Sequence, residues 1–239
     1  MAIERILLVL GNSVSLPPPE AVGAPVIPYP ALLRERLKPA GWRVEERSSS
    51  GATVAEIERT ARNTLPRLQP AAVVIQLGIV DCAPRPLRPW ERRLLERLQP
   101  RRLRDRIVAF LHEHRAPVIR RRGLIQKTDI TAFREHFRRL LDDCLPATSA
   151  VAILPIFPAT GAILARNPRL AAEIDKYNDA MSMDPRAVTL DSVEVFGAVS
   201  IEDLSITPES VHLNQRGHDF IARAAERWLF ATMSRTGTE

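Results

Sequence analysis

Short, continuous apolar runs recur along the chain and alternate with longer amphipathic segments. The first run extends from Ile6 to Leu10, and similar runs cover residues 71–77 and 150–156. A continuous apolar run that is bounded by turn residues is typical of a strand buried on both faces of a parallel sheet. Weaker strand patterns at 42–47 and 187–191 bring the expected number of strands to five.

The segments between these strands carry helical signals. Apolar side chains recur at helical spacing over 29–37, 54–65, 129–145 and 168–183, and Asn214 can cap a final helix that runs to about residue 233. Strands that alternate with helices form a parallel sheet covered on both faces. The sequence therefore predicts an α/β protein, namely a single three-layer α/β/α, flavodoxin-like domain over residues 1–239 with a five-stranded parallel sheet.

Positive charge is concentrated in one segment. Residues 83–123 contain thirteen arginines and four acidic residues, a balance of +9 within a chain of net charge +6. Apolar residues at helical spacing predict two amphipathic helices there, separated near Pro100. We interpret the segment as an arginine-rich helical insertion in the domain. Its plainest role is a solvated face, and nucleic-acid binding is a weaker alternative, because interleaved aromatic residues and a known motif are lacking.

Composition excludes several classes of protein. Apolar residues make up 45% of the chain and charged residues 26%, values typical of a globular protein. No apolar run reaches the length of a membrane span, and the N-terminus lacks a basic leader and an Ala-x-Ala cleavage site, so we expect a cytoplasmic protein. Cys82 and Cys144 have no metal-binding or redox spacing. We therefore expect no metal and no cofactor.

Three polar residues suggest nucleophilic catalysis. Ser13 follows the first strand, and His212 lies in a loop before the last helix, three residues after Glu209. Strand ends and their loops gather at one edge of a parallel sheet, so these distant positions can converge. A serine hydroxyl needs a base such as imidazole, and a carboxylate behind the ring orients it. The pattern predicts a triad of Ser13, His212 and Glu209.

Four blocks of the chain, spread over nearly its whole length, resemble those of the SGNH/GDSL hydrolases. They are Gly11-Asn12-Ser13, Gly51, Gly78-Ile79-Val80-Asp81 and the stretch from Glu209 to His218, which is similar to the family's Asp-x-x-His-Leu-Asn-x-x-Gly-His. The last block is the most specific, because acid, base and helix start fall at the family's spacing. The Gly-x-Ser-x-Gly motif of ordinary α/β-hydrolases is absent.

The resemblance implies that Ser13 is the nucleophile and that the backbone N–H groups of Ser13 and Gly51 serve the oxyanion hole. Two departures are conservative, since Asn12 and Glu209 replace aspartates of the family pattern. The third is more serious: Val80 stands where the family has an asparagine that donates to the oxyanion. Arg85 in the same loop is a candidate substrate-binding residue and a candidate substitute donor.

The resemblance also implies an esterase that removes an O-acyl group from a sugar, a lipid or another small molecule through an acyl-serine intermediate. Two alternatives remain open. The same triad could transfer the acyl group to another alcohol, or the chain could be a catalytically weak, carbohydrate-binding relative, as the loss of asparagine at position 80 would favour.

The position of the arginine-rich segment suggests the charge of the substrate. A local positive field raises the concentration of anionic ligands near a site. We therefore expect a small, anionic ester substrate, with an anionic membrane surface as a less favoured partner and no nucleic acid. The sequence does not indicate an oligomeric state.

Overall fold

The computed structural model describes residues 5–21, 25–148 and 150–236. Its centre is a parallel sheet of five strands in the order β2-β1-β3-β4-β5. The strands are β1 (Arg5–Gly11), β2 (Trp42–Ser48), β3 (Ala72–Gln76), β4 (Val151–Leu154) and β5 (Val188–Thr189). This order and direction confirm the predicted flavodoxin-like α/β fold.

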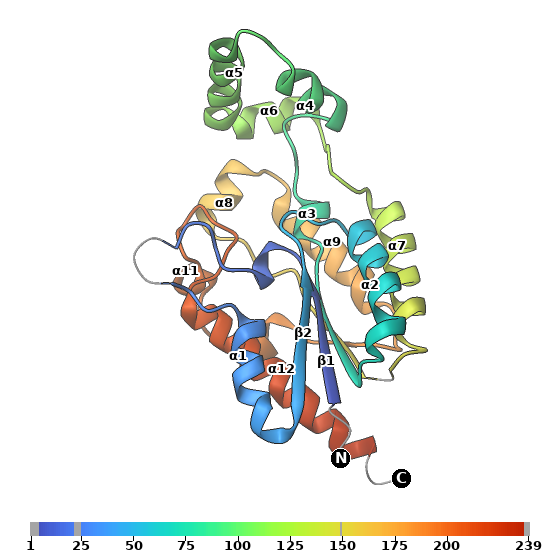
Figure 1. Ribbon diagram of the computed structural model, residues 1–239. Coiled ribbons are helices and arrows are strands. Elements are labelled where there is room, and N and C mark those ends of the chain that lie inside the picture. Colours follow the sequence, from blue (N-terminus) through green and yellow to red (C-terminus); the bar gives the residue numbers. More distant parts are fainter. Residues whose placement is uncertain (1–4, 22–24, 149, 237–239) are drawn as a thin grey trace.

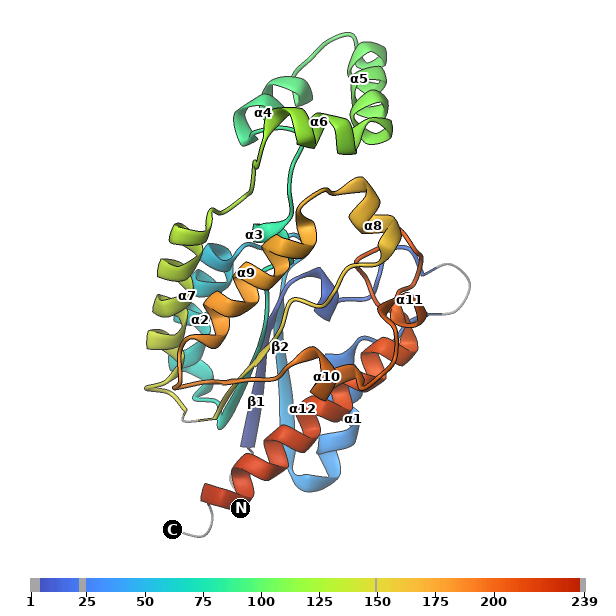
Figure 2. The same ribbon diagram turned by 180° about the vertical axis from the view of Figure 1, so that it is seen from behind.

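Helices cover both faces of the sheet (Figures 1 and 2). The longer ones are α1 (Tyr29–Leu37), α2 (Val54–Leu68), α7 (Ile130–Cys144), α9 (Leu170–Ser182) and α12 (Gln215–Thr236). Each of them falls on a predicted helix. Six short helices in the described residues were not predicted, because their few turns leave little periodicity in the sequence. They are η1 (Ser13–Ser15), η2 (Lys38–Ala40), α3 (Ile79–Cys82), α8 (Gly161–Arg166), α10 (Ser192–Phe196) and α11 (Ile201–Leu204).

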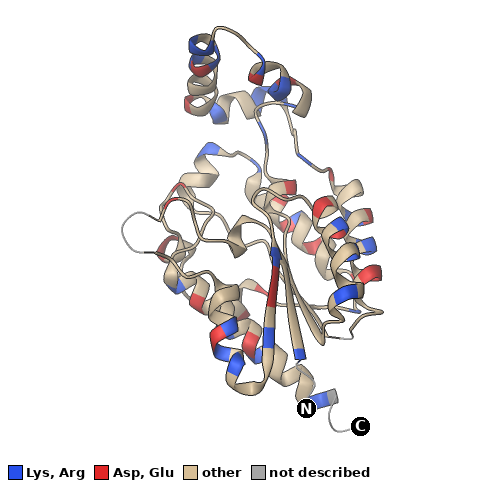
Figure 3. Cartoon of the chain, in the orientation of Figure 1, with Lys and Arg blue, Asp and Glu red and all other residues tan. Residues whose placement is uncertain are grey.

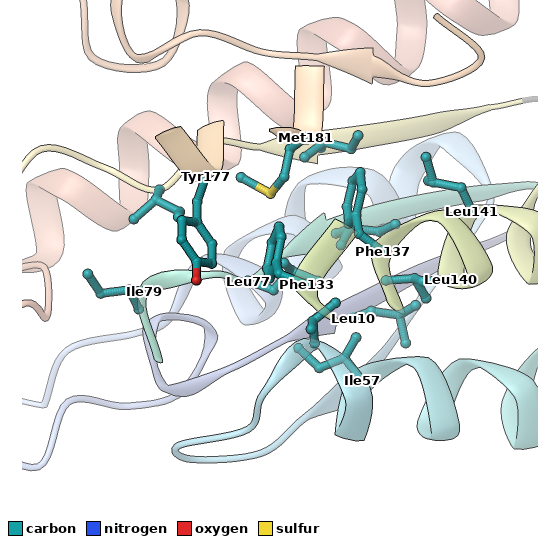
Figure 4. Close-up of a cluster of buried hydrophobic side chains, with 14 of the residues drawn as sticks. Leu10, Ile57, Leu77, Ile79, Phe133, Phe137, Leu140, Leu141, Tyr177 and Met181 are labelled. Atoms are coloured by element: carbon teal, nitrogen blue, oxygen red, sulfur yellow. The ribbon is translucent and has the colours of Figure 1, made fainter. Parts of the chain in front are cut away.

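Two hydrophobic layers hold the helices on the sheet. On one face α2, α7 and α9 pack over strand residues such as Leu10, and the Phe133 ring meets the ring of Tyr177 with centroids 4.7 Å apart (Figure 4). On the other face α1, α10 and α12 pack over the alternate strand residues, such as Leu7 and Val9. Alternation along β1 therefore supplies both layers from a single apolar run.

The carboxyl ends of the central strands lie side by side. Gly11, at the end of β1, pairs with Ser48 of β2 and Gln76 of β3. The segments that leave these strands therefore start next to one another. They are η1, the loop before α2 and the loop that contains α3.

The arginine-rich insertion extends beyond this edge of the sheet (Figure 1). It contains α4 (Pro89–Glu96), α5 (Arg101–Glu113) and α6 (Arg115–Arg122). Blue ribbon segments, which mark Lys and Arg, recur along it in Figure 3. The predicted break near Pro100 is present. The second predicted helix is divided again at His114, which leaves Pro117 in the first turn of α6, where its missing N–H costs no helical hydrogen bond.

Several apolar side chains of the insertion face solvent. Trp90 is 58% exposed, Leu94 64% and Phe110 54%. None of the helices in the described residues is both long enough and apolar enough to cross a membrane.

Candidate active site

A tight turn presents Ser13 at the end of β1. Asn12 is fully buried, and its Oδ1 accepts a hydrogen bond from the N–H of Val14 at 3.1 Å, which caps η1. The turn brings Ser15 back against the strand, because a Cβ atom on Gly11 would lie 2.0 Å from the Ser15 Oγ. Glycine is therefore required here, and the half-buried Ser13 is positioned by two buried polar neighbours.

His212 is held by a carboxylate that the sequence analysis did not select. Its Nδ1 lies 2.8 Å from Oε2 and 3.0 Å from Oε1 of Glu20. Ser210 completes the cluster, since its Oγ donates to Glu20 at 3.1 Å and accepts from the His212 N–H at 3.0 Å. A carboxylate at Nδ1 keeps the ring proton on that atom and leaves Nε2 with a free lone pair.

The other imidazole nitrogen is available for chemistry. The Nε2 of His212 is buried and has no hydrogen-bond partner within the described part of the chain. Ser13 and Val211, the residue before this histidine, line one cavity of about 180 Å³. The described residues contain no hydrogen bond between Ser13 and His212, which is common where a base and a nucleophile tighten only around substrate.

The structure does not bring Glu209 to the imidazole. Its side chain is exposed, and no interaction with His212 involves it. Glu20 lies 192 positions before His212 in the chain and belongs to a proline-rich loop, so no spacing links the two. The sequence offered only a weak signal for Glu20, namely an acidic residue soon after the nucleophile block.

The environment of Glu20 favours its charged form. Burial raises the pKa of Glu20, but hydrogen bonds from its own backbone and from His212 outweigh that effect, so the pKa is lowered.

The third block, residues 78–81, contributes to the lining of the Ser13 cavity. Gly78 adopts φ +108°, and a Cβ atom there would lie 2.6 Å from Ile156, so the turn requires glycine. Val80 lines the Ser13 cavity. Asp81 is fully buried and accepts hydrogen bonds from the Val54 N–H and, at 2.6 Å, from the Thr128 hydroxyl. Asp81 therefore ties this block to the start of α2.

Gly51 lies in the loop between β2 and α2, with φ +69°. The loop is fastened to the nucleophile strand, because the Ser49 N–H donates to the Gly11 carbonyl at 3.1 Å. A second tether joins Lys127 Nζ to the Gly51 carbonyl at 2.8 Å. Within the described residues the N–H groups of Ser13 and Gly51 donate to no protein acceptor.

Arg85 lines the Ser13 cavity, as does Arg115 from the beginning of α6. The Arg85 Nη2 donates to the carbonyl of Val80 at 3.0 Å. The position of Arg85 in the loop made it predictable from the sequence, whereas Arg115, thirty residues further along the chain, was not predicted. No group of three potential metal ligands occurs among the residues that the structure describes.

His218 is linked through Tyr29 to the turn that carries Ser13. It is buried, its Nδ1 accepts from the Tyr29 N–H at 3.3 Å, and the Tyr29 hydroxyl is 3.0 Å from the Ser15 Oγ. Burial lowers the pKa of His218 to about 4, with the nearby His212 acting in the same direction. A neutral, packed imidazole fits a structural role for His218.

Comparisons with known proteins identify the family and the fold. Residues 9–220 match the model of the GDSL-like lipase/acylhydrolase family. The fold is similar to that of the lipase/acylhydrolase from Enterococcus faecalis, with TM-score 0.61 and 14% identity, covering 93% of this chain and 94% of that one. It is also similar to Axe2, an acetylxylan esterase from Geobacillus stearothermophilus, with TM-score 0.60 and 17% identity over 94% and 93% of the two chains. No curated protein sequence matches the chain.

Proposed function

The chain belongs to the GDSL-like lipase/acylhydrolase family, and from that premise we propose that it is a serine esterase in which Ser13 is the nucleophile, His212 the general base and Glu20 the orienting acid. The observation that carries this proposal is the state of the His212 ring. One nitrogen is held by a carboxylate at 2.8 Å, and the other is buried without a protein partner.

The proposed reaction has two steps. The Ser13 Oγ attacks the ester carbonyl carbon while its proton passes to the His212 Nε2, and the tetrahedral intermediate then expels the alcohol, which takes that proton. Water attacks the acyl-serine with His212 again as base, and the acid leaves as Ser13 recovers its proton. Glu20 stabilises the ring each time it becomes positively charged.

The backbone N–H groups of Ser13 and Gly51 are the proposed oxyanion donors. Their lack of protein acceptors supports this assignment. Val80 contributes no polar side chain at the place where the family has an asparagine, and one oxyanion donor is worth about 10²–10³ in kcat. We therefore expect a slow enzyme on simple esters.

A short acyl group suits the space beside the nucleophile. An adjoining recess of about 20 Å³ shares Ile79, Ile163 and Val211 with the Ser13 cavity and is lined mainly by apolar side chains. That volume accommodates a group the size of one water molecule or methyl group. An acetyl ester is therefore a fitting test substrate.

The arginine-rich insertion lies beyond the carboxyl edge of the sheet, where Ser13 is presented (Figure 3). Its positive charge supports an anionic natural substrate.

The experiment compares the parent protein with Ser13→Ala. The parent should cleave an aryl acetate and be labelled by a serine-reactive phosphonate, and Ser13→Ala should lose both properties at an unchanged melting temperature. Ser182→Ala, at the exposed end of α9, is the matched control and should behave like the parent. Retention of cleavage and labelling by Ser13→Ala would refute the assignment of the nucleophile.

Two alternatives give different results in the same assay. An O-acyltransferase would be labelled at Ser13 but would cleave the acetate faster when an acceptor alcohol is added. A ligand-binding relative, which the loss of asparagine at position 80 favours, would show neither labelling nor cleavage.

A further inference from the structure

Two arginines from different parts of the chain line the cavity of the proposed nucleophile. Arg85 follows α3, and Arg115 begins α6 at the far end of the insertion. Both line the cavity that Ser13 lines. The insertion therefore contributes a wall of the site in addition to its exposed outer faces.

Neutral oxygens hold both groups. Arg85 donates to the Val80 carbonyl at 3.0 Å, and its Nε is buried without a partner. Arg115 donates from Nε to the Asn167 Oδ1 at 2.6 Å and from Nη2 to the Pro84 carbonyl at 2.8 Å. These bonds orient the guanidinium planes but do not neutralise their charge.

No carboxylate within the described residues forms an ion pair with either arginine. Other arginines of the insertion do have such partners, because Arg92 pairs with Glu96 at 2.9 Å and Arg122 pairs with Glu91. The Asp81 carboxylate acts on Arg85 through space, but its own hydrogen bonds come from Val54 and Thr128.

Burial and neighbouring positive charges also destabilise the charged forms of both arginines. Burial lowers the pKa of Arg115, and the charge of Arg85 lowers it further. Burial likewise lowers the pKa of Arg85, with Arg92 adding to the effect. Two partly buried cations without an ion-pair partner are costly to the free protein, and an anion between them would relieve both the desolvation and the repulsion.

We propose that Arg85 and Arg115 form a subsite for an anionic group, a carboxylate or a phosphate, carried by the ester substrate. The guanidinium fork matches the oxygens of either group and can bind them through two parallel hydrogen bonds. This inference rests on the proposed esterase function, and it assigns the recognition of charge to two residues instead of to the field of the whole insertion.

The kinetic test compares Arg115→Gln and Arg85→Gln with Arg106→Gln, which removes the same charge from an exposed position of α5. The substrates are phenyl acetate and 4-acetoxyphenyl phosphate. Both subsite variants should lower kcat/KM for the phosphate-bearing ester at least about tenfold, mainly through KM, and Arg115→Gln should change kcat/KM for phenyl acetate less than twofold. Arg106→Gln should change neither by more than twofold, and Arg115→Lys should restore part of the loss.

Equal losses in Arg115→Gln and Arg106→Gln would overturn the subsite in favour of a general field. Equal losses on the two esters would also overturn it, because they would indicate a structural role. A binding assay separates this inference from the proposed function: inorganic phosphate should raise the melting temperature of Ser13→Ala and of the parent but not of Arg115→Gln. If no ester is cleaved and this difference is present, the subsite stands and the esterase proposal fails. If phosphate stabilises all variants equally or none, the subsite is refuted.

Discussion

The contact between His212 and Glu20 predicts that the orienting carboxylate belongs to Glu20, whereas the sequence alone assigns this role to Glu209. We expect Glu20→Gln to impair ester hydrolysis and Glu209→Gln to leave it nearly unchanged. Glutamine keeps the shape of the side chain but removes its charge. It can also turn its amide NH₂ toward Nδ1 and so favour the tautomer that carries its proton on Nε2.

The magnitude follows from the geometry. The carboxylate oxygens of Glu20 lie 2.8 and 3.0 Å from the Nδ1 of His212, and a hydrogen bond to a charged group contributes about 1.5–3 kcal/mol. The Glu20 side chain is 36% exposed, so water screens the interaction and favours the lower half of that range. At about 1.4 kcal/mol per factor of ten in rate, kcat/KM should fall about ten- to fortyfold. A fully buried triad acid is worth about 10⁴.

The assay is the initial rate of aryl acetate hydrolysis, measured for the parent and the two variants at equal folded fraction. Glu209 is the matched control, since it has the same side chain and lies three residues from His212 but is exposed. The reasoning is refuted if Glu20→Gln stays within twofold of the parent, or if Glu209→Gln causes the larger loss.

Three further predictions concern neighbouring residues. Val80→Asn should raise kcat for the aryl acetate at least about tenfold and at most by the 10²–10³ that a well-aligned oxyanion donor contributes, because it restores a polar donor to the cavity wall. An unchanged kcat would contradict the idea that a missing donor slows the enzyme. Burial raises the pKa of Asp81 from 3.8 to about 6, so this residue contributes stability that is present below pH 3.8 and is lost, by about 3 kcal/mol, as pH rises through 6. Asp81→Asn should remove that component in urea unfolding at pH 4 and pH 7, and an unaltered pH dependence would contradict the shift. His218 acts in the opposite direction, since its pKa is lowered from 6.5 to about 4 and its contribution to the free energy of unfolding is lost as pH falls through that window. His218→Asn should therefore reduce the loss of stability between pH 6.5 and pH 4, and an undiminished loss would exclude His218 as its cause.

Local physics made the strands and long helices predictable. The run Ile6–Leu10 is apolar on both alternating faces, which suits only a strand covered on two sides, and β1 lies at that position. The cap at Asn214 was equally local, because its Oδ1 accepts from the Gly217 N–H only three residues away. Such signals depend on neighbours in the chain and not on the final fold.

Tertiary structure decided how the site is completed. The sequence by itself determined that Ser13 follows a central strand and that His212 precedes the last helix. It could not determine the carboxylate, because Glu20 reaches the imidazole through the path of a loop, and local spacing favoured Glu209. It also could not place Arg115 in the Ser13 cavity, since that depends on where the insertion returns to the domain. Contacts between residues far apart in the chain follow from the packing of whole elements, and no periodicity in the sequence encodes them.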